Sequence, residues 1–579
     1  MKLVFWHWFL LFVTLVPSSL GLTSDGLALL ALSKNLMLPN NISSNWNASN
    51  ATPCKWNSVT CDKRGNVISL DLTSSGISGS LGPEIGHLEY LQVLSLSDNN
   101  ISGSIPPELG NCNMLEQLDL SQNFLSGQIP ASMGNLKKLS LLSLYSNSLS
   151  GAIPKELFKN QFMEKVYLHS NQLSGSIPFS VGEMKSLRSL WLHENMLSGV
   201  LPDSICNCTK LEELYLLDNQ LGGDLPKNLS EIKGLRIFDA TSNNFTGEIP
   251  FSFEKNCKLE IFILSFNQIR GEIPKWLGNC SSLTQLAFVN NSLSGQIPPA
   301  VGLLRNLTYL LLSQNNLSGP IPPEIGNCRL LLWLELDANQ LEGTVPKELA
   351  NLRNLQKLFL FENRLTGDFP EDIWSIQSLQ SVLIYRNGFT GKLPSVLAEL
   401  KFLQNITLFD NFFTGAIPPG LGANSHLVEV DFTNNSFVGG IPPNICSGKT
   451  LRILDLGSNH LTGSIPSGVV DCPSLERLIV QDNSFSGHIP EFRNCMGLNY
   501  IDLSHNGFDG PVPPNVFSNC HCLVQISPQA NSLNVSIPGF RDCTNLGIID
   551  LSYNTFSDKT PPKYVYCVRC NGRKGGSFT

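Results

Sequence analysis

Apolar and polar positions alternate along this chain in a frame that returns with a fixed period. The frame reads L-x-x-L-x-L-x-x-N-x-L-x-G-x-h-P, where h is apolar, and residues 187–202 (LRSLWLHENMLSGVLP) show it in full. The prolines that close the frame are 24 residues apart, at Pro106, Pro130, Pro154, Pro178, Pro202, Pro226, Pro250, Pro274, Pro298, Pro322, Pro346, Pro370, Pro394, Pro418, Pro442, Pro466 and Pro490. Such a period predicts a solenoid, in which each coil packs only on its neighbours.

The x-L-x-L-x part of each frame has the two-residue period of a strand. Its leucines point into a core, and the intervening residues point to the opposite face. We therefore predict a right-handed α/β repeat fold of roughly twenty repeats over residues 67–560, with a parallel ribbon of strands on the concave face. Polar positions such as Glu108 and Glu324 predict short helical or 3₁₀ turns on the convex side.

An asparagine ends each strand segment of the frame. Examples are Asn99, Asn123, Asn147, Asn171, Asn195, Asn219, Asn243, Asn435, Asn459, Asn483, Asn506, Asn531 and Asn554. A turn inside a stack leaves backbone groups unpaired, and an amide offers both donors and an acceptor to satisfy them. We expect these asparagines to be structural, bonding neighbouring coils together.

The chain begins with segments that do not carry the frame. Residues 1–21 have one early lysine, an apolar centre and small residues at the end, which indicates a secretory signal peptide. Residues 22–66 predict a cap with a helix from Ser24 and apolar cover for the first coil from Leu27, Leu29, Leu30, Leu32, Trp56 and Val59. In an oxidising compartment we expect a disulfide between Cys54 and Cys61.

Composition and motifs narrow the function. The formal charge of −8 comes without any run of Lys or Arg, so we expect neither nucleic acid nor an anionic membrane as a partner. Catalytic motifs such as G-x-S-x-G and HExxH and the set of kinase motifs are missing from the sequence. We expect no catalysis, no cofactor and no metal ion. After residue 21 no stretch approaches the ~20 apolar residues of a membrane span.

The last segment, residues 561–579, has no repeat frame. Cys567 and Cys570 could pair in a substitute cap, a CxxC pair is weak evidence for zinc, and a truncated gene product explains the segment equally well.

Glycosylation acceptor motifs are frequent, as expected of an exported chain. We predict glycans at Asn41, Asn47, Asn100, Asn207, Asn228, Asn244, Asn279, Asn290, Asn306, Asn316, Asn434 and Asn534. The motif at Asn50 is a further acceptor, and that at Asn405 is a weaker one because it lies inside a predicted strand.

Eight further cysteines share one position, three residues before a repeat's first leucine. They are Cys112, Cys208, Cys280, Cys328, Cys472, Cys495, Cys520 and Cys543. The recurrence predicts a small buried packing site, although Cys495, Cys520 and Cys543 lie in successive coils and could form bridges.

Binding is best sought at the outward strand positions, whose identity the fold does not dictate. One aromatic group there is Tyr145, Tyr167, His169, Trp191, His193 and Tyr215, and a second is Tyr309, Trp333, Phe359, Phe361, Tyr385 and Phe409. Glu335 and Asp337 flank the second group, and Glu429, Asp431, Asp455 and Arg477 follow it. Either these rings brace one another between coils, or they anchor an extended peptide that gains direction from the charges.

The segments LSGSIPPELGNC, LSGQIPPAVG, LSGPIPPEIGNC and LTGSIPSGVV make the frame resemble the plant-specific leucine-rich repeat. In that family the array is the extracellular sensor of receptor-like kinases. Segments such as SDGLALLAL, ATPCKWNSVTCD, LFENRLTGDFP and LRILDLGSNHLTGSIP are most similar to receptors for endogenous danger peptides of the Pep type. Such receptors continue into a membrane span and a kinase, and the present sequence contains neither.

The resemblance also implies roles for individual residues. Pep-type receptors hold the C-terminal end of their ligand near an acidic residue and an arginine, and the matching positions are Asp431 in VEVDF and Arg477 in LERLIV. Phe359 stands where close relatives carry an acidic residue. The resemblance implies recruitment of a leucine-rich repeat co-receptor kinase as well.

These observations predict an extracellular, peptide-sensing receptor or receptor fragment in plant defence or cell-surface signalling. The chain would pass through the secretory pathway to the apoplast. The predicted ligand-binding residues are Tyr167, Trp191, His193, Tyr215, Trp333, Phe359, Tyr385, Asp431 and Arg477. Two alternatives stay open, a soluble decoy that sequesters the ligand and an inhibitor of a secreted wall-degrading enzyme.

Overall fold

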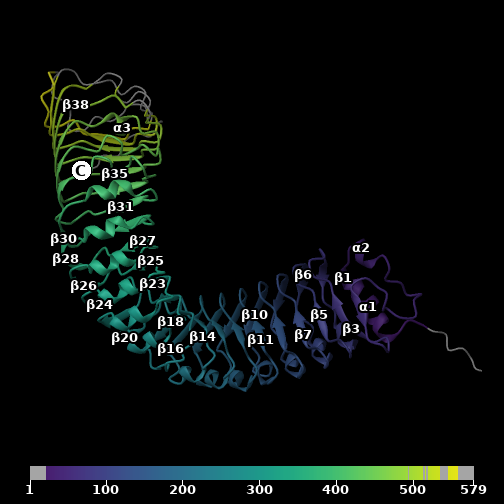
Figure 1. Ribbon diagram of the computed structural model, residues 1–579. Helices are drawn as coiled ribbons and strands as arrows, with labels where there is room; N and C mark the ends of the chain where they lie inside the picture. The colour runs from purple at the N-terminus through teal and green to yellow at the C-terminus, as the bar shows by residue number, and fades with distance from the viewer. Residues whose placement is uncertain (1–20, 493–494, 513–515, 517–519, 535–544, 558–579) are drawn as a thin grey trace, which may run out of the picture. The chain divides into compact units, whose positions relative to one another are not determined.

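The computed structural model describes residues 21–492, 495–512, 516, 520–534 and 545–557. The chain divides into two compact units, Met1–Gly222 and Gly223–Thr579, which we call unit 1 and unit 2 and describe separately. In both units each coil contributes one strand to a parallel ribbon and a second strand to a flanking sheet, as Figure 1 shows. The predicted leucine-rich repeat solenoid is thereby confirmed.

Unit 1 begins with the cap. Helix α1 (Ser24–Asn35) has Thr23 as its N-cap, whose side chain accepts a hydrogen bond from the Gly26 amide. The cap also contains β1 (Leu36–Met37), α2 (Asn40–Ser43) and β2 (Val59–Cys61), which pairs antiparallel with the first ribbon strand.

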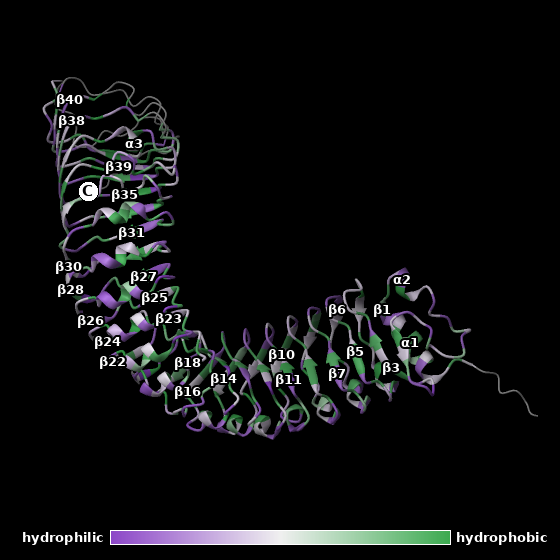
Figure 2. Ribbon diagram, viewed as in Figure 1, coloured by the Kyte–Doolittle hydropathy of each residue, from purple (hydrophilic) through white to green (hydrophobic). Residues whose placement is uncertain are grey.

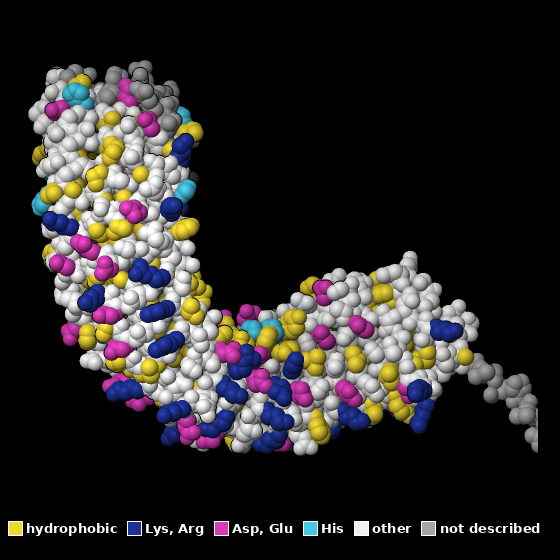
Figure 3. Space-filling view, viewed as in Figure 1, with side chains coloured by type: hydrophobic (Ala, Val, Ile, Leu, Met, Phe, Trp, Pro, Cys, Tyr) yellow, Lys and Arg dark blue, Asp and Glu magenta, His cyan; other side chains and the backbone are white. Residues whose placement is uncertain are grey.

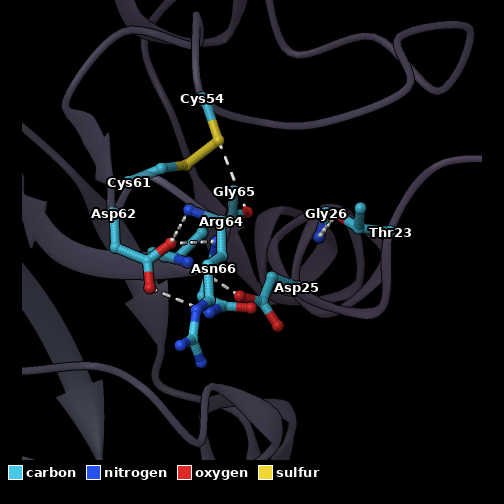
Figure 4. The surroundings of a disulfide bond; sticks show 10 residues. Thr23, Asp25, Gly26, Cys54, Cys61, Asp62, Arg64, Gly65 and Asn66 are labelled. Atoms are coloured by element: carbon cyan, nitrogen blue, oxygen red, sulfur yellow. Dashed lines mark hydrogen bonds between the residues drawn. A yellow bond between two sulfur atoms is a disulfide. The ribbon is translucent and has the colours of Figure 1, made fainter.

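Two bonds tie this cap together, and Figure 4 shows the disulfide and the Asp25 side chain. The Asp25 carboxylate accepts a hydrogen bond of 2.8 Å from the Val67 amide at the start of the ribbon. Cys54 and Cys61 form a disulfide. The expected apolar cover is wrong at Leu27, which is 58% exposed because it lies on the outer side of α1, whereas Leu29 and Leu32 are buried.

The parallel ribbon of unit 1 consists of β3 (Val67–Asp71), β5 (Val93–Ser95), β7 (Gln117–Asp119), β9 (Leu141–Ser143), β11 (Lys165–Tyr167), β13 (Ser189–Trp191) and β15 (Glu213–Tyr215). The flanking sheet contains β4 (Ser78–Ser80), β6 (Asn100–Gly103), β8 (Phe124–Gly127), β10 (Ser148–Ala152), β12 (Gln172–Gly175), β14 (Met196–Val200) and β16 (Gln220–Asp224). The 3₁₀ turns are η1 (Pro83–His87), η2 (Pro107–Asn111), η3 (Ala131–Asn135), η4 (Leu157–Lys159), η5 (Phe179–Glu183) and η6 (Asp203–Asn207).

The ribbon of unit 2 consists of β17 (Ile237–Asp239), β19 (Ile261–Ile263), β21 (Gln285–Ala287), β23 (Tyr309–Leu311), β25 (Trp333–Glu335), β27 (Lys357–Phe359), β29 (Ser381–Leu383), β31 (Asn405–Thr407), β33 (Glu429–Asp431), β35 (Ile453–Asp455), β37 (Arg477–Ile479), β39 (Tyr500–Asp502), β41 (Gln525–Ser527) and β43 (Ile548–Ile549). Its turns are η7 (Leu229–Glu231), η8 (Lys275–Asn279), η9 (Pro299–Leu303), η10 (Pro323–Asn327), η11 (Lys347–Asn351), η12 (Glu371–Ser375), η13 (Ser395–Glu399) and the short α-helix α3 (Ser467–Val470).

Flanking strands in unit 2 are β18 (Asn244–Thr246), β20 (Arg270–Glu272), β22 (Ser292–Gly295), β24 (Asn316–Gly319), β26 (Gln340–Gly343), β28 (Arg364–Asp368), β30 (Gly388–Thr390), β32 (Thr414–Ala416), β34 (Ser436–Gly439), β36 (His460–Gly463), β38 (Ser484–His488), β40 (Gly507–Pro511) and β42 (Ser532–Asn534). Across the part of the chain that the structure describes, every helix is too short or too polar to span a bilayer.

The core follows from the frame. The leucines of the frame are buried in each coil, for example Leu187, Leu190, Leu192 and Leu197. Figure 2 shows hydrophobic residues recurring from coil to coil. The glycine of G-x-h-P has a positive φ in nearly every coil, for example 77° at Gly199. Only glycine adopts this conformation readily, so the tight turn after the flanking strand explains its recurrence.

The frame asparagines are structural, as predicted. In Asn195, Nδ2 donates to three carbonyl oxygens, those of Leu168, Leu192 and His193, at 3.0–3.1 Å. Its Oδ1 accepts from the Leu173 amide of the preceding coil at 2.9 Å. One side chain thus satisfies backbone groups of two coils, and the pattern repeats along both units.

The cysteines divide into two groups. Disulfides join Cys257 to Cys280, Cys446 to Cys472 and Cys495 to Cys520, and each links successive coils. The described members of the predicted packing site are buried, as expected, and Cys112, Cys208 and Cys328 among them are free. The bridge between Cys495 and Cys520 confirms that successive members can pair, whereas the bridges of Cys280 and Cys472 were not predicted. The bridges form where the preceding coil offers a second cysteine. Cys543, Cys567 and Cys570 lie outside the described residues.

Candidate functional site

The outward side chains of the ribbon strands form columns, because neighbouring strands are parallel and in register. Tyr167 pairs with Trp191, and Trp191 pairs with Tyr215, at equivalent positions of successive coils. Parallel strands lie about 4.8 Å apart, so side chains in one column contact one another. We call the surface made by these side chains the ribbon face of each unit.

An aromatic cluster occupies the ribbon face of unit 1. Tyr145, His169 and His193 stack almost in parallel, with ring centroids 4.5 and 4.3 Å apart. Beside this stack, Trp191 lies 4.7 Å from Tyr167. Figure 3 shows histidine side chains among hydrophobic ones in this part of unit 1.

The remaining member of the cluster, Tyr215, lies 5.2 Å from Trp191 in an edge contact. All six rings are partly exposed on the ribbon face, so none of the predicted residues of unit 1 points into the leucine core. We call these six side chains the unit 1 cluster.

The unit 1 cluster is electrically neutral at its centre. Burial lowers the pKa of His169 to about 4, and the neighbouring His193 lowers it further while Glu194 acts in the opposite sense. The Nδ1 atom of His169 is buried and has no hydrogen-bond partner among the described residues. At neutral pH this imidazole is therefore an uncharged ring in an aromatic stack.

One carboxylate fixes the tryptophan of the unit 1 cluster. The Trp191 indole N–H donates to Glu213 Oε2 at 3.1 Å, and the Ser189 hydroxyl donates to the same oxygen at 3.0 Å. A buried or half-buried indole N–H needs such an acceptor. Together with the ring contacts to Tyr167 and Tyr215, this bond sets the orientation of the indole.

A second aromatic group lies on the ribbon face of unit 2. Phe361, Tyr385 and Phe409 stack at 4.4 and 4.2 Å, with interplanar angles of 11° and 12°. Phe359 joins the end of this stack at 6.3 Å from Phe361 in a tilted contact. We call Phe359, Phe361, Tyr385 and Phe409 the unit 2 stack.

Cations of the chain itself lie over several rings of unit 2. Lys357 Nζ is 3.5 Å from the centroid of the Trp333 ring, and the Arg386 guanidinium is 5.6 Å from that of Phe409. Arg386 also forms ion pairs with Glu362 and Asp410. These cation–π contacts hold the rings in place and bring positive charge to the ribbon face.

Two carboxylates follow the tryptophan of unit 2 along the chain, and Glu335 is half-buried whereas Asp337 is buried. Burial raises the pKa of Glu335, and Asp337 raises it further while Lys357 lowers it. Burial also raises the pKa of Asp337, which accepts a hydrogen bond of 2.6 Å from the Ser313 hydroxyl. The ring of Trp333 thus has the Lys357 cation over its face, and two carboxylates of raised pKa follow it along the chain.

A group of charged side chains follows on β33, β35 and β37. Asp431 and Asp455 are opposite each other in register, and Arg477 Nε is 2.9 Å from Asp455 Oδ2. The Arg477 guanidinium also lies 5.3 Å from the Tyr500 ring centroid. We call Glu429, Asp431, Asp455, Arg477 and Tyr500 the charged cluster.

Carboxylates outnumber the cation in the charged cluster. Burial raises the pKa of Asp455 to about 7, against the lowering effect of Arg477, and Asp431 raises it further. Burial is also the main cause of the raised pKa values of Glu429 and Asp431. Three acidic groups therefore share one guanidinium, which favours the protonated form of the carboxyl groups.

The structure brings some predicted residues together and separates others. Asp431 and Arg477 belong to one cluster, but the ion pair of Arg477 is with Asp455, which lies between them. Phe359 and Tyr385 belong to the unit 2 stack. Trp333 does not: its neighbours are Tyr309, at 5.1 Å, and Lys357.

Sequence reasoning missed Lys357, Arg386 and Tyr500 as members of these surfaces. Each occupies an outward strand position or directly follows one, so the period of the frame could have predicted that these side chains lie on the ribbon face. Only the contacts of Lys357 and Arg386 with rings one coil away show their role.

Most of the predicted glycosylation residues are exposed. Asn279 differs, because its side chain is half-buried and Nδ2 donates to the Phe253 carbonyl oxygen at 3.0 Å. A glycan there would replace one of the two N–H groups of this half-buried amide. Asn405 is half-buried on β31, on the ribbon face of unit 2.

Comparisons with known proteins add the family. The model described as leucine rich repeat N-terminal domain matches residues 22–62, and the leucine rich repeat model matches residues 90–112, 114–136, 186–208, 258–280, 306–328, 354–376, 450–472 and 497–520. Both descriptions agree with the cap and coils seen in the structure.

Curated relatives match over short stretches. A receptor-like protein kinase of Ipomoea nil is 48% identical over 88 residues, 14% of this chain and 8% of the relative. The leucine-rich repeat receptor-like protein kinase PEPR1 of Arabidopsis thaliana is 55% identical over 74 residues, 12% of this chain and 7% of the relative. The matched stretches thus span less than a tenth of the length of these two kinases.

Solved structures match over most of the chain. The structure of PEPR1 with AtPEP1 is 44% identical, with a TM-score of 0.87 over 92% of this chain and 79% of that chain. The Arabidopsis receptor kinase HAESA, in complex with the peptide hormone IDA and the co-receptor SERK1, is 33% identical, with a TM-score of 0.80 over 93% and 95%. The chain therefore belongs to the plant leucine-rich repeat receptor kinase family, which it matches through the extracellular repeat array.

Proposed function

We propose that this chain binds an extracellular peptide on its ribbon face, as the ligand-binding part of a plant cell-surface receptor. The observation that carries the proposal is the run of aromatic columns on unit 2 together with the charged cluster of the same ribbon. Two solved relatives that span most of the chain, PEPR1 with AtPEP1 and HAESA with IDA, are peptide complexes. That likeness supports the same ligand class here.

The geometry of unit 2 suits an extended chain. Aromatic rings one coil apart offer apolar area at regular intervals, which a peptide that crosses successive strands would meet in turn. Arg477 is 47% exposed in its side chain and can bind a terminal carboxylate through two parallel hydrogen bonds. Asp431 would accept a hydrogen bond from an amide or a basic group of the ligand.

The unit 1 cluster is proposed as an apolar contact surface of its own. Tyr167, Trp191, His193 and Tyr215 are partly exposed rings, and such side chains dominate the energy of many interfaces. In this proposal the surface contributes area to peptide binding, and it contributes no charge recognition.

The finer role follows the resemblance to Pep-type receptors. We propose that the ligand is a danger-type peptide, that the chain acts on the extracellular side of the plasma membrane, and that a leucine-rich repeat co-receptor kinase joins the complex. Phe359 would then alter peptide preference, because an aromatic ring replaces the acidic residue of close relatives.

Calorimetry of the secreted protein with synthetic AtPEP1 peptide tests the proposal. We expect binding that falls at least about tenfold in Arg477→Ala, since a charged hydrogen-bonded pair contributes about 1.5–3 kcal/mol. Arg452→Ala is the matched control, because Arg452 pairs with Glu476 outside the charged cluster. Equal affinities of all three proteins would remove the site assignment, and absence of any binding would exclude this ligand.

A further inference from the structure

The guanidinium of Arg477 is held on one edge only. Its Nε lies 2.9 Å from Asp455 Oδ2 and 3.3 Å from Oδ1. Among the described residues, the hydrogen bond of this guanidinium is made by Nε, and its two Nη atoms form none. A guanidinium has five N–H donors in a planar fork, so the Nε edge is engaged while the pair of Nη groups remains available.

Asp455 itself is not available to a ligand. The residue is 5% exposed, whereas the side chain of Arg477 is 47% exposed. The Tyr500 ring, 5.3 Å from the guanidinium, limits its movement further. The arrangement pairs a buried carboxylate with a cation that is about half exposed to solvent.

We propose that Asp455 is a positioning residue that orients the Nη fork of Arg477 toward a carboxylate of the ligand without touching the ligand. This inference rests on the proposed function and deepens it, because it assigns the residue that orients the carboxylate-binding arginine. An arginine held in place loses less conformational freedom on binding, so its bidentate pair with a carboxylate is stronger than that of a mobile arginine.

Asp455 has a second, opposing effect through its charge. When ionised it lies close behind Arg477 and repels a carboxylate bound in front of it. When protonated it loses this charge, but its carbonyl oxygen still accepts the Nε hydrogen bond. The neutral form therefore keeps the orientation and removes the repulsion.

Other titratable groups surround this pair and contribute to the same response. Glu429 and Asp431 face it from β33, and Tyr500 and Asp502 lie on β39. Arg452, which adjoins β35, is engaged by Glu476. Burial raises the pKa of Asp455 to about 7, so its charge changes within the range where a peptide's terminal carboxylate stays ionised.

Two variants separate orientation from charge, because both remove the charge and only one keeps an acceptor. Asp455→Asn retains an oxygen for the Arg477 Nε–H, and Asp455→Ala does not. The readout is the ratio of dissociation constants for AtPEP1 peptide with a C-terminal amide and with a free C-terminal acid, measured by calorimetry.

In the wild-type protein we expect the free acid to bind at least about tenfold more tightly than the amide. Asp455→Asn should keep or increase this ratio, and Asp455→Ala should lower it to less than about threefold. Equal ratios in Asp455→Asn and Asp455→Ala would overturn the proposal. Arg477→Ala should abolish the preference in every background.

The pH profile is the second readout. From pH 8 to pH 6 the ratio of the wild-type protein should rise a few-fold as Asp455 takes up a proton, and Asp455→Asn should show a smaller rise that comes from Glu429 and Asp431. If the ratio depended on pH equally in the wild-type protein and in Asp455→Asn, the effect of charge that we assign to Asp455 would be wrong.

Crystal structures of the two unliganded variants test the inference without a peptide. The Arg477 guanidinium should keep its place in Asp455→Asn and leave it in Asp455→Ala. An unchanged guanidinium in both variants would contradict the proposal. If the wild-type protein binds no AtPEP1 peptide, the proposed function fails for this ligand, and these two structures alone decide the role of Asp455.

Discussion

The unit 1 cluster and the unit 2 stack are built at the same position of the repeat but differ in their electrostatics. Tyr145 and His169 in unit 1, like Phe361 and Tyr385 in unit 2, directly follow the second leucine position of the strand, and both sets stack at 4.2–4.5 Å. Unit 1 has the neutral imidazole of His169 at the centre of its stack, whereas unit 2 surrounds its stack with Arg386 and acidic groups. One scaffold position therefore supports both an apolar and a charged surface.

The largest expected effect is that of removing the cation from the charged cluster of unit 2. Arg477→Ala leaves Asp455 buried without its cation, and we expect a loss of about 2 kcal/mol in the stability of unit 2 at pH 8. The loss should shrink at pH 5, where the carboxylates take up protons. Amide hydrogen exchange of β33, β35 and β37 measures it, and Arg452→Ala should change exchange little, because exposed pairs contribute less than about 1 kcal/mol. A loss that is independent of pH would contradict the explanation.

Removing the central ring of each stack compares their packing. Tyr385→Ala should destabilise unit 2 by about 2 kcal/mol, and His169→Ala should destabilise unit 1 by about 1 kcal/mol, because the tyrosine buries more apolar surface. Hydrogen exchange of β29 and β11 reports the two changes separately. A larger effect of His169→Ala would show that the histidine stack is the stronger one.

The two units should respond to acid in opposite directions. The folded-state pKa of His169 is about 4, below its ordinary value, so its contribution to stability is present above pH 6.5 and is lost as the pH falls toward 4. The folded-state pKa of Asp455 is about 7, above its ordinary value, so the charged cluster becomes less unfavourable as the pH falls from 8 toward 4. Exchange rates of β11 and β35, corrected for intrinsic pH effects, should change in opposite senses.

The smallest expected effect is that of His169→Phe, which gives unit 1 the ring type of unit 2. It removes a buried nitrogen without a partner and keeps the stack, so stability at pH 7 should change by less than about 1 kcal/mol. Its main result should be a flatter pH dependence of exchange in β11. An unchanged acid response would show that another group causes it.

Much of the fold followed from the sequence because each coil repeats one set of requirements. Asn195 is needed because backbone groups of the turn would otherwise lack hydrogen-bond partners. Gly199 is needed because the turn has a positive φ there. The frame did not reveal that the residue before each asparagine also has positive φ, such as Glu194 with 53°. That position varies freely in sequence, so it gave no signal.

The surfaces were less predictable than the scaffold. The period placed Asp431 and Arg477 on one face, but partner choice depends on distances between neighbouring side chains, and Arg477 pairs with Asp455. Two of the disulfides were also missed, because their second cysteines, Cys257 and Cys446, do not lie three residues before the first leucine of a repeat.

The asparagine ladder has a consequence for how such a protein changes over generations. Each asparagine side chain forms hydrogen bonds only with its own coil and the preceding one, so every coil contains the residue that joins it to its neighbour. A whole coil could be duplicated or deleted and the neighbours would still join. New combinations of outward side chains can therefore arise by duplication of coils, because the asparagine hydrogen bonds between coils stay the same.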